Sequence, residues 1–321
     1  MKLSPHLVAP YPYFGGKRRA AELVWSRFGV VKNYVEPFCG SLAVLLKAPE
    51  GKRMETVNDL NGFVVNFWRA VKADPEAVAA WANWPVSEID LEARHGWLSN
   101  RAERLCWALG DPDYYDAKTA GWWSWGQATW IGSGWCTGAG PWVSNGVEFF
   151  SHEPDRKDAL PRVKRALPAL SNNGMGVHRQ ISTDEAPTRS DFIRQWMAAL
   201  SERIREVRII CGDWSRCVKP SVTTHHGLTA IFIDPPYKSE GVSKRLYQRE
   251  AGVAAEAGVW CAEHGNNPLL RIAICGYEGD YNLPGWTVIN GRATNSGYGG
   301  GAGNKNNLRE RIWFSPHCHG A

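Results

Sequence analysis

The sequence predicts an α/β fold with a parallel sheet, interrupted by an inserted domain. Near the N-terminus, short apolar runs alternate with stretches of helical periodicity, which is the pattern of strands joined by crossover helices. The alternation stops after residue 74 and resumes at residue 206. Because each flanking part supplies only part of a sheet, we expect residues 1–74 and 206–321 to form one discontinuous domain, with residues 75–205 as the insert.

The N-terminal part supplies two strand and helix pairs. After an irregular start, residues 20–28 have the spacing of a helix. The stretch NYVEPFCGS (33–41) then predicts a strand that breaks into a Pro/Gly turn, and residues 42–48 predict a short apolar helix. A second strand over residues 53–59 ends in polar side chains, and the helix that follows it stops before Pro75.

The C-terminal part supplies the remaining strands. Apolar runs bounded by turn residues predict them. We expect a helix near residues 251–264 and strands within residues 207–214, 229–233, 270–277, 285–290 and 308–315.

The insert is rich in tryptophan and glycine. Eleven of the 17 tryptophans lie between Trp81 and Trp196, and no internal repeat explains their concentration. Large aromatic side chains concentrated in a small domain most often form its core.

Composition bounds the class of protein. The chain has 321 residues, of which 44% are hydrophobic and 21% charged, as in ordinary soluble proteins. Its formal charge of +5 permits a nucleic-acid partner without requiring one. No apolar stretch has the length of a signal peptide or a membrane span, so we expect a cytoplasmic protein with no membrane partner. The eight cysteines form no C-x-x-C pair, which favours free thiols and no metal site.

The stretch TAIFIDPPY (229–237) places an acid where a buried strand ends. Pro235 and Pro236 cannot continue a central strand, because neither has an N–H to donate. In an open α/β sheet, ligands bind at the carboxyl ends of the strands, so Asp234 is well placed for chemistry. The competing interpretation is a capping aspartate in a proline-rich turn.

Two further strand ends carry candidate ligand-binding groups. Glu36 precedes a tight turn in which Gly40 would let the backbone approach a ligand closely. The stretch lacks the spacing of a dinucleotide fingerprint or a P-loop, so we do not expect the ligand to be held chiefly by phosphates. Asp59 ends the second strand and is placed to accept from a ribose diol; the alternative is a helix cap.

Taken together, an ordered set of motifs resembles the Dam-like (group α) DNA adenine-N6 methyltransferases. The insert falls where this group carries its target-recognition domain, and the resemblance covers both halves of the α/β domain. It implies a class I methyltransferase fold with a Rossmann-like mixed sheet. The motifs are YFGGK (13–17), VEPFCGS (35–41), VNDLNGFVVNFWRAVK (57–72), CGDW (211–214), DPPY (234–237), ICGYEG (274–279) and NKNNLRERIWFSP (304–316).

The resemblance implies S-adenosyl-L-methionine (AdoMet) as methyl donor and S-adenosyl-L-homocysteine (AdoHcy) as product. Asp59 would accept from the ribose hydroxyls, and Asp213 with Trp214 would meet the adenine ring. Lys17 would reach the AdoMet carboxylate or the target base. The implied cofactor-binding residues are Tyr13, Lys17, Glu36, Pro37, Phe38, Gly40, Asp59, Asp213, Trp214 and Asp234.

The resemblance also implies a catalytic role for the D-P-P-Y tetrapeptide. Asp234 and the Pro235 carbonyl would each accept one N–H of an exocyclic amine, which directs its lone pair toward the methyl group. Tyr237 would stack on the base, and no metal is required. The implied catalytic residues are Lys17, Asp234, Pro235, Pro236 and Tyr237.

DNA is the implied partner, and no obligatory protein partner is evident. A target base must leave the duplex to reach such a pocket, so the insert would supply aromatic and basic contacts. The competing interpretation is that the tryptophans are core and the charges lie on a solvated helical face. The candidate DNA contacts are Trp122, Trp125, Arg156, Lys157, Arg162, Lys164 and Arg165.

Several alternatives stay open at this point. The same tetrapeptide would accept the N4 amine of cytosine, although serine is more usual there. A catalytically inactive AdoMet- or DNA-binding protein of the same fold is a second alternative, and an RNA or protein methyltransferase a third. The motif order suits a bacterial enzyme, including one encoded by a phage or mobile element, whether restriction-linked, host-protective or regulatory.

Overall fold

The chain divides into two compact units. The computed structural model describes residues 7–13, 17–130, 135–136, 142–144, 149–151, 176–179, 181, 186–236, 244–290 and 310–320. Tyr13–Asn61 and Glu206–Ala321 form one unit, called the sheet unit here. Met1–Pro12 and Gly62–Arg205 form the other, called the helical unit.

Residues 1–12 belong to the helical unit and not to the expected discontinuous domain, and the boundary expected at 74/75 lies at 61/62. The cause is α2 (Gly62–Ala73), whose inward side chains pack against α6 (Ala117–Gln127) and α7 (Arg189–Ile204) of the helical unit. The assignment of the sheet unit to catalysis and of the helical unit to target recognition remains a proposal.

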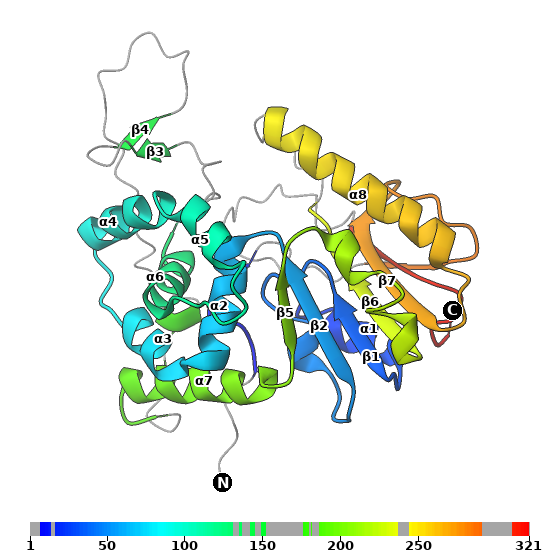
Figure 1. Ribbon diagram of the computed structural model, residues 1–321, viewed down its shortest axis with the longest axis horizontal. Helices are drawn as coiled ribbons and strands as arrows, with labels where there is room; N and C mark the ends of the chain where they lie inside the picture. Colours follow the sequence, from blue (N-terminus) through cyan, green and yellow to red (C-terminus); the bar gives the residue numbers. More distant parts are fainter. Residues whose placement is uncertain are drawn as a thin grey trace. The chain divides into compact units, whose positions relative to one another are not determined.

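The sheet unit contains a seven-stranded mixed sheet, as the resemblance implies. Figure 1 shows β6 between β1 and β7 near its centre. The strand order is β5-β2-β1-β6-β7-β9-β8, in which β9 runs antiparallel to both of its neighbours and the other pairs are parallel. The strands are β1 (Asn33–Glu36), β2 (Met54–Asp59), β5 (Arg208–Cys211), β6 (Thr229–Ile233), β7 (Leu270–Tyr277), β8 (Thr287–Asn290) and β9 (Glu310–Phe314).

The register of the last strands brings a residue distant in sequence to the carboxyl edge of the parallel strands. Ile233, the last residue of β6, pairs with Ile274 of the parallel strand β7. Because β9 is antiparallel, its first residue, Glu310, pairs with Tyr277, the last residue of β7. Glu310 therefore lies at the same edge of the sheet as the carboxyl ends of the parallel strands.

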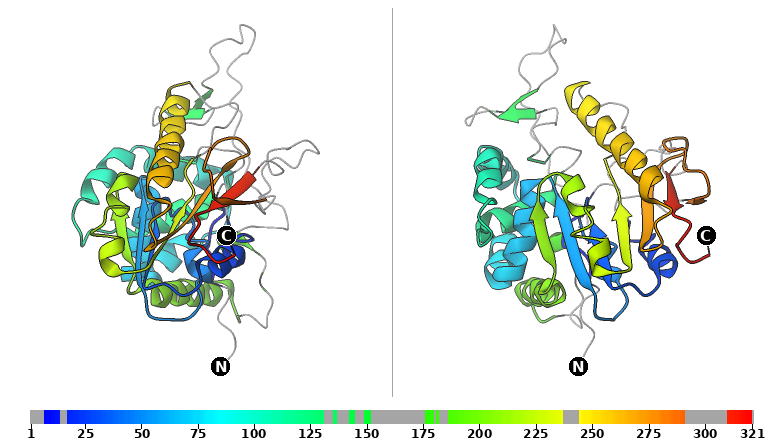
Figure 2. Two further views of the ribbon diagram at one scale, coloured as in Figure 1. Left: turned by 90° about the vertical axis from the view of Figure 1, so that its right-hand side faces the viewer. Right: turned by 45° about the vertical axis from the view of Figure 1, so that its right-hand side comes forward.

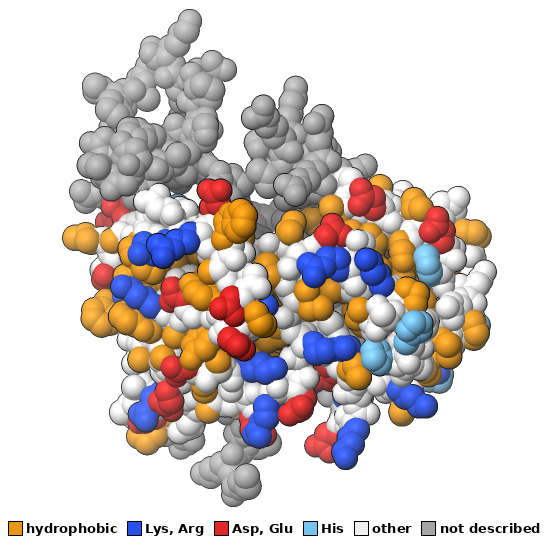
Figure 3. Space-filling view, viewed as in Figure 1, with side chains coloured by type: hydrophobic (Ala, Val, Ile, Leu, Met, Phe, Trp, Pro, Cys, Tyr) orange, Lys and Arg blue, Asp and Glu red, His pale blue; other side chains and the backbone are white. Residues whose placement is uncertain are grey.

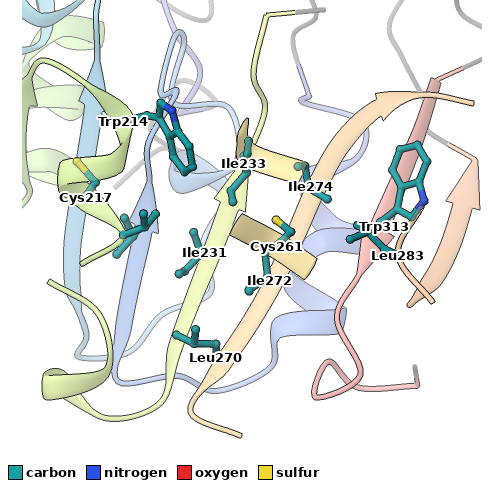
Figure 4. Packing of buried hydrophobic residues seen from close by; sticks show 13 residues of the cluster. Trp214, Cys217, Ile231, Ile233, Cys261, Leu270, Ile272, Ile274, Leu283 and Trp313 are labelled. Atoms are coloured by element: carbon teal, nitrogen blue, oxygen red, sulfur yellow. The ribbon is translucent and has the colours of Figure 1, made fainter. Parts of the chain in front are cut away.

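The two faces of this sheet are covered by different helices. Figure 4 shows Cys261, from α8 (Lys244–His264), lying among Ile231, Ile272 and Ile274. Successive strand residues point to opposite faces, so Arg271 turns away from this cluster. Its guanidinium donates to the carbonyl of Phe28, at the end of α1 (Ala21–Phe28) on the other face. The ribbons of α1 (dark blue) and α8 (yellow) can be followed in the two views of Figure 2.

Three-residue and four-residue helical turns complete the sheet unit. Where residues 42–48 predict a short helix, the chain forms only a 3₁₀ turn, η1 (Leu45–Lys47). The reason is local: Leu42 has φ +54°, outside the helical region, and Ala48 is already extended before Pro49. The other turns are η3 (Trp214–Cys217) and η4 (Thr224–His226).

The helical unit is held together by buried aromatic residues. Trp68, Trp123, Trp125 and Trp196 are fully buried. Several of its helices begin at side-chain caps: Asp74, for example, accepts from the N–H of Ala77. Besides α2, α6 and α7, the unit contains α3 (Pro75–Ala82), α4 (Glu88–Ser99), α5 (Ala102–Ala108), η2 (Gly176–His178) and a hairpin of β3 (Trp142–Ser144) with β4 (Phe149–Ser151).

Within the described part of the chain, no helix combines the length and the apolar character that crossing a membrane requires.

Because β6 is buried on both faces, shortening one of its side chains should lower the free energy of unfolding substantially. Ile231→Ala should lower the free energy of unfolding by about 2–5 kcal/mol, because its side chain is fully enclosed between β1, β7 and α8. Val288→Ala, on the edge strand β8 and half-exposed, should change it by less than about 0.5 kcal/mol. Urea unfolding followed by tryptophan fluorescence measures both, and similar losses in the two variants would contradict this account of the core.

Candidate active site

A buried ion cluster occupies the carboxyl edge of the sheet. The Nζ atom of Lys17 lies 3.1 Å from Oδ1 of Asp234 and 2.7 Å from Oε1 of Glu310. Lys17 is only 3% exposed, and Glu310 is also buried. Burial lowers the pKa of Lys17, but the nearby carboxylates, Asp234 first, more than offset it, so the pKa is raised above 10.5. Lys17 therefore stays a cation shared by two carboxylates.

Asp234 reaches this cluster because β6 ends where the sequence predicts. Thr229–Ile233 are all buried, and Asp234 follows directly, partly exposed. Pro235 is buried and Pro236 exposed. Neither proline can donate to a neighbouring strand. The predicted stacking residue, Tyr237, lies outside the described residues.

Glu36 ends β1 as a buried carboxyl group. Its Oε2 atom accepts from the hydroxyl of Tyr34, two residues earlier on the same strand face, at 2.9 Å. Burial raises the pKa of Glu36 from 4.5 to about 8; the Tyr34 hydrogen bond opposes this shift, and the charge of Asp234 adds to it. A carboxyl group with this pKa holds its proton at neutral pH and can donate as well as accept.

Gly40 and Asp59 join the ends of β1 and β2. Oδ2 of Asp59 accepts from the N–H of Gly40 at 2.9 Å, and Oδ1 accepts from the N–H of Asn61 at 2.8 Å. Burial raises the pKa of Asp59, and these N–H groups oppose the rise. Gly40 has φ +42°, and a Cβ there would lie 2.5 Å from Cε1 of Tyr13. Only glycine fits this close approach of backbone and aromatic ring.

Asn58, one of the polar side chains at the end of the second strand, holds two neighbouring loops together. Its side-chain amide donates to the carbonyl of Pro37 and to that of Gly212, each at 2.9 Å. It thereby links the loops that follow β1 and β5 to the end of β2. The sequence offered one signal for this role, a polar amide in a strand, one residue before Asp59. Its partners could not be predicted, because they depend on the order of the strands in the sheet.

The predicted adenine-binding residues lie in the loop after β5. The rings of Phe38 and Trp214 stack with centroids 5.9 Å apart and an interplanar angle of 29°. Trp214 is mostly buried, whereas Asp213 is exposed. Oδ1 of Asp213 accepts from the N–H of Ser215, so this carboxylate caps η3. The structure thus assigns Asp213 a capping contact.

The predicted DNA contacts have mixed outcomes. Trp125 belongs to the core: it is fully buried and its indole N–H donates to the carbonyl of Trp84 at 2.9 Å, so its ring is not open to a base. This corrects the expectation for Trp125. Trp122 is partly exposed and lies beneath the ammonium of Lys118, 4.4 Å from the ring centroid. Arg156, Lys157, Arg162, Lys164 and Arg165 lie outside the described residues.

Comparison with known proteins identifies the N-terminal part of this arrangement. Residues 13–89 match the family model of D12 class N6 adenine-specific DNA methyltransferase. The matched segment contains Lys17, Glu36, Gly40 and Asp59, and it confirms the resemblance that the motifs indicate. No curated protein matches the chain.

The raised pKa of Glu36 predicts how stability depends on pH. Between pH 4.5 and about 8, the unfolded chain has lost this proton while the folded protein keeps it. The free energy of unfolding should therefore fall as pH rises through this range, by up to about 1.4 kcal/mol per pH unit from this group. Glu36→Gln should remove this part of the slope.

Urea unfolding at several pH values between 5 and 8 tests the prediction, with Glu22→Gln, on the exposed side of α1, as the control. Equal pH dependence in the wild type and in Glu36→Gln would contradict it.

Proposed function

We propose that the chain, whose residues 13–89 match the family of D12 class N6 adenine-specific DNA methyltransferases, methylates the exocyclic N6 amine of a flipped adenine, with AdoMet as donor. The observation that carries the proposal is Asp234 at the carboxyl end of β6, joined to Lys17 and followed by Pro235. This observation supports the proposal because an amine with two N–H groups needs two acceptors, which the Asp234 carboxylate and the neighbouring Pro235 carbonyl would provide.

The residues at the ends of β1 and β2 fit AdoMet. When bound, it supplies a methyl group on a positively charged sulfur. Asp59 would accept from the ribose hydroxyls, and the close backbone at Gly40 would admit the methionine end beside Glu36. Phe38 and Trp214 would present apolar ring surfaces to the adenine.

Asp234 and Pro235 would prepare the amine for attack. The lone pair of an exocyclic amine is delocalised into the base and is therefore a poor nucleophile. Accepting one N–H each, the carboxylate and the carbonyl would turn the nitrogen toward tetrahedral geometry and free its lone pair. Because the proline ring fixes φ, the carbonyl direction is set in advance. Asp234 then takes the proton that becomes acidic as the new N–C bond forms.

Exposed aromatic and basic side chains of the helical unit would contact the DNA. Trp81, Trp84 and Trp107 are exposed, and the ammonium of Lys118 lies 5.1 Å from the ring centroid of Trp81. On the face shown in Figure 3, basic side chains are interspersed with acidic and exposed hydrophobic ones. Such a surface suits phosphate contacts combined with stacking on unpaired bases. Trp122 and the basic residues of 156–165 remain proposed contacts.

Transfer of labelled methyl from AdoMet to unmethylated genomic DNA, followed by nucleoside digestion, tests the reaction. We expect the label in N6-methyladenine. Asp234→Ala should lower kcat by about 100-fold or more, because the amine loses both an oriented acceptor and a proton acceptor.

Calorimetric binding of AdoHcy to Asp234→Ala provides the control for folding of the site. Label in N4-methylcytosine would move the proposal to cytosine, and no label in either base, despite bound cofactor, would refute DNA methyl transfer by this site. Full activity in Asp234→Ala would refute its role.

Trp107 tests the proposed DNA surface. Trp107→Ala should weaken binding of single-stranded DNA by about 5- to 150-fold, the cost of one lost base–aromatic stack, without changing AdoHcy affinity. The ring is 80% exposed on α5, so its loss should not disturb the core. Ile89→Ala removes a similarly exposed side chain of α4 that cannot stack, and should leave DNA affinity unchanged. Fluorescence anisotropy measures both, and equal effects would contradict the stacking role.

A further inference from the structure

Glu310 enters the proposed active site from a part of the chain to which the sequence analysis assigned no chemistry. It is the first residue of β9, and its backbone position is set by pairing with Tyr277. Its Oε1 atom makes the shorter of the two contacts to Lys17. Its Oε2 atom is buried and has no hydrogen-bond partner among the described residues.

A structural role alone does not explain this carboxylate. Asp234 already provides a counter-ion for the Lys17 ammonium. A second buried carboxylate adds a desolvation cost, which is larger when one oxygen lacks a donor. Strand pairing of β9 requires only the backbone of Glu310. A carboxylate that is kept despite this cost points to a function for its charge.

Lys17, Asp234 and Glu310, taken as the described members of the cluster, carry one net negative charge. Two carboxylates share the single ammonium of Lys17, so the formal charges do not cancel. Because Lys17 and Glu310 are buried, solvent and salt screen this charge weakly. Without Glu310, Lys17 would neutralise Asp234 and the cluster would carry no net charge.

This charge matters for the donor that the proposed function requires, on which the inference rests. The donor carries a positive charge on sulfur, and the thioether left after methyl transfer does not. The amine held by Asp234 attacks the methyl carbon, so the reaction itself requires the sulfur to lie near this cluster. A net negative cluster therefore stabilises the donor more than the product.

We propose that Glu310 is a positioning residue that holds Lys17 beside Asp234 and supplies the charge by which the site prefers the cationic methyl donor to its neutral thioether product. The preference favours exchange of product for donor. The preference for the donor depends on the summed charge of Lys17, Asp234 and Glu310, and not on the charge of Glu310 alone.

Binding without turnover tests the proposal. Isothermal titration calorimetry of the full chain, without DNA, would compare AdoHcy with sinefungin, a stable analogue that carries an amine in place of the sulfonium. Glu310→Gln should reduce the preference for sinefungin over AdoHcy by about tenfold or more, with AdoHcy affinity nearly unchanged. Glu278→Gln removes a surface carboxylate that pairs with Arg311, and should leave the preference unchanged.

A double variant separates charge from structure. Lys17→Met with Glu310→Gln leaves Asp234 as the single charge of the cluster, so the net charge is again that of the wild type. We expect the preference for sinefungin to return toward the wild-type value. If Glu310→Gln alone does not fold, the double variant can be measured in its place. It contains no buried ammonium that would need a second carboxylate as partner.

The outcomes distinguish the inference from the proposed function. An unchanged preference in Glu310→Gln, an equal loss of both ligands, or a double variant without recovery would overturn the role of Glu310 while leaving the methyltransferase proposal intact. If the wild type bound neither ligand, the proposed cofactor would be wrong and the inference would fall with it.

Discussion

The buried ammonium of Lys17 is the constraint on which the site depends. A buried cation must be paired, and its two partners come from segments far apart in the sequence, Asp234 after β6 and Glu310 at the start of β9. Only a sheet in which β9 runs antiparallel to β7 brings Glu310 to the edge where β6 ends. The strand order, the N-terminal segment and the proposed chemistry are therefore linked by a single charged group.

Around this cluster, the loops at the strand ends are held by hydrogen bonds between side chains and the backbone. Asn58 ties Pro37 to Gly212, and Asp59 ties Gly40 to Asn61. A carboxylate or carbonyl can orient an amine only if it does not have to move when the ligand arrives. The same polar side chains that would meet a cofactor thus also fix the shape of its binding loops.

The features that could be predicted from the sequence are those set by local patterns. The end of β6 directly before Asp234 follows from an apolar run and two prolines, and the strand-end position of Glu36 follows from the turn at Gly40. Glu310 could not be predicted, because its role arises from the pairing of strands distant in sequence. Tryptophan content likewise gave no means to tell the buried Trp125 from exposed Trp107, since helix packing decides which ring is covered.

The central claim is that Asp234 and Pro235 hold the exocyclic nitrogen of the target base. A structure of the protein with sinefungin and an oligonucleotide containing its mapped target would test it most directly. The account predicts adenine N6 within hydrogen-bonding distance of the Asp234 carboxylate and the Pro235 carbonyl, with Lys17 still joined to Asp234 and Glu310. A flipped base whose amine meets other acceptors, or a site in which Lys17 leaves both carboxylates, would contradict it.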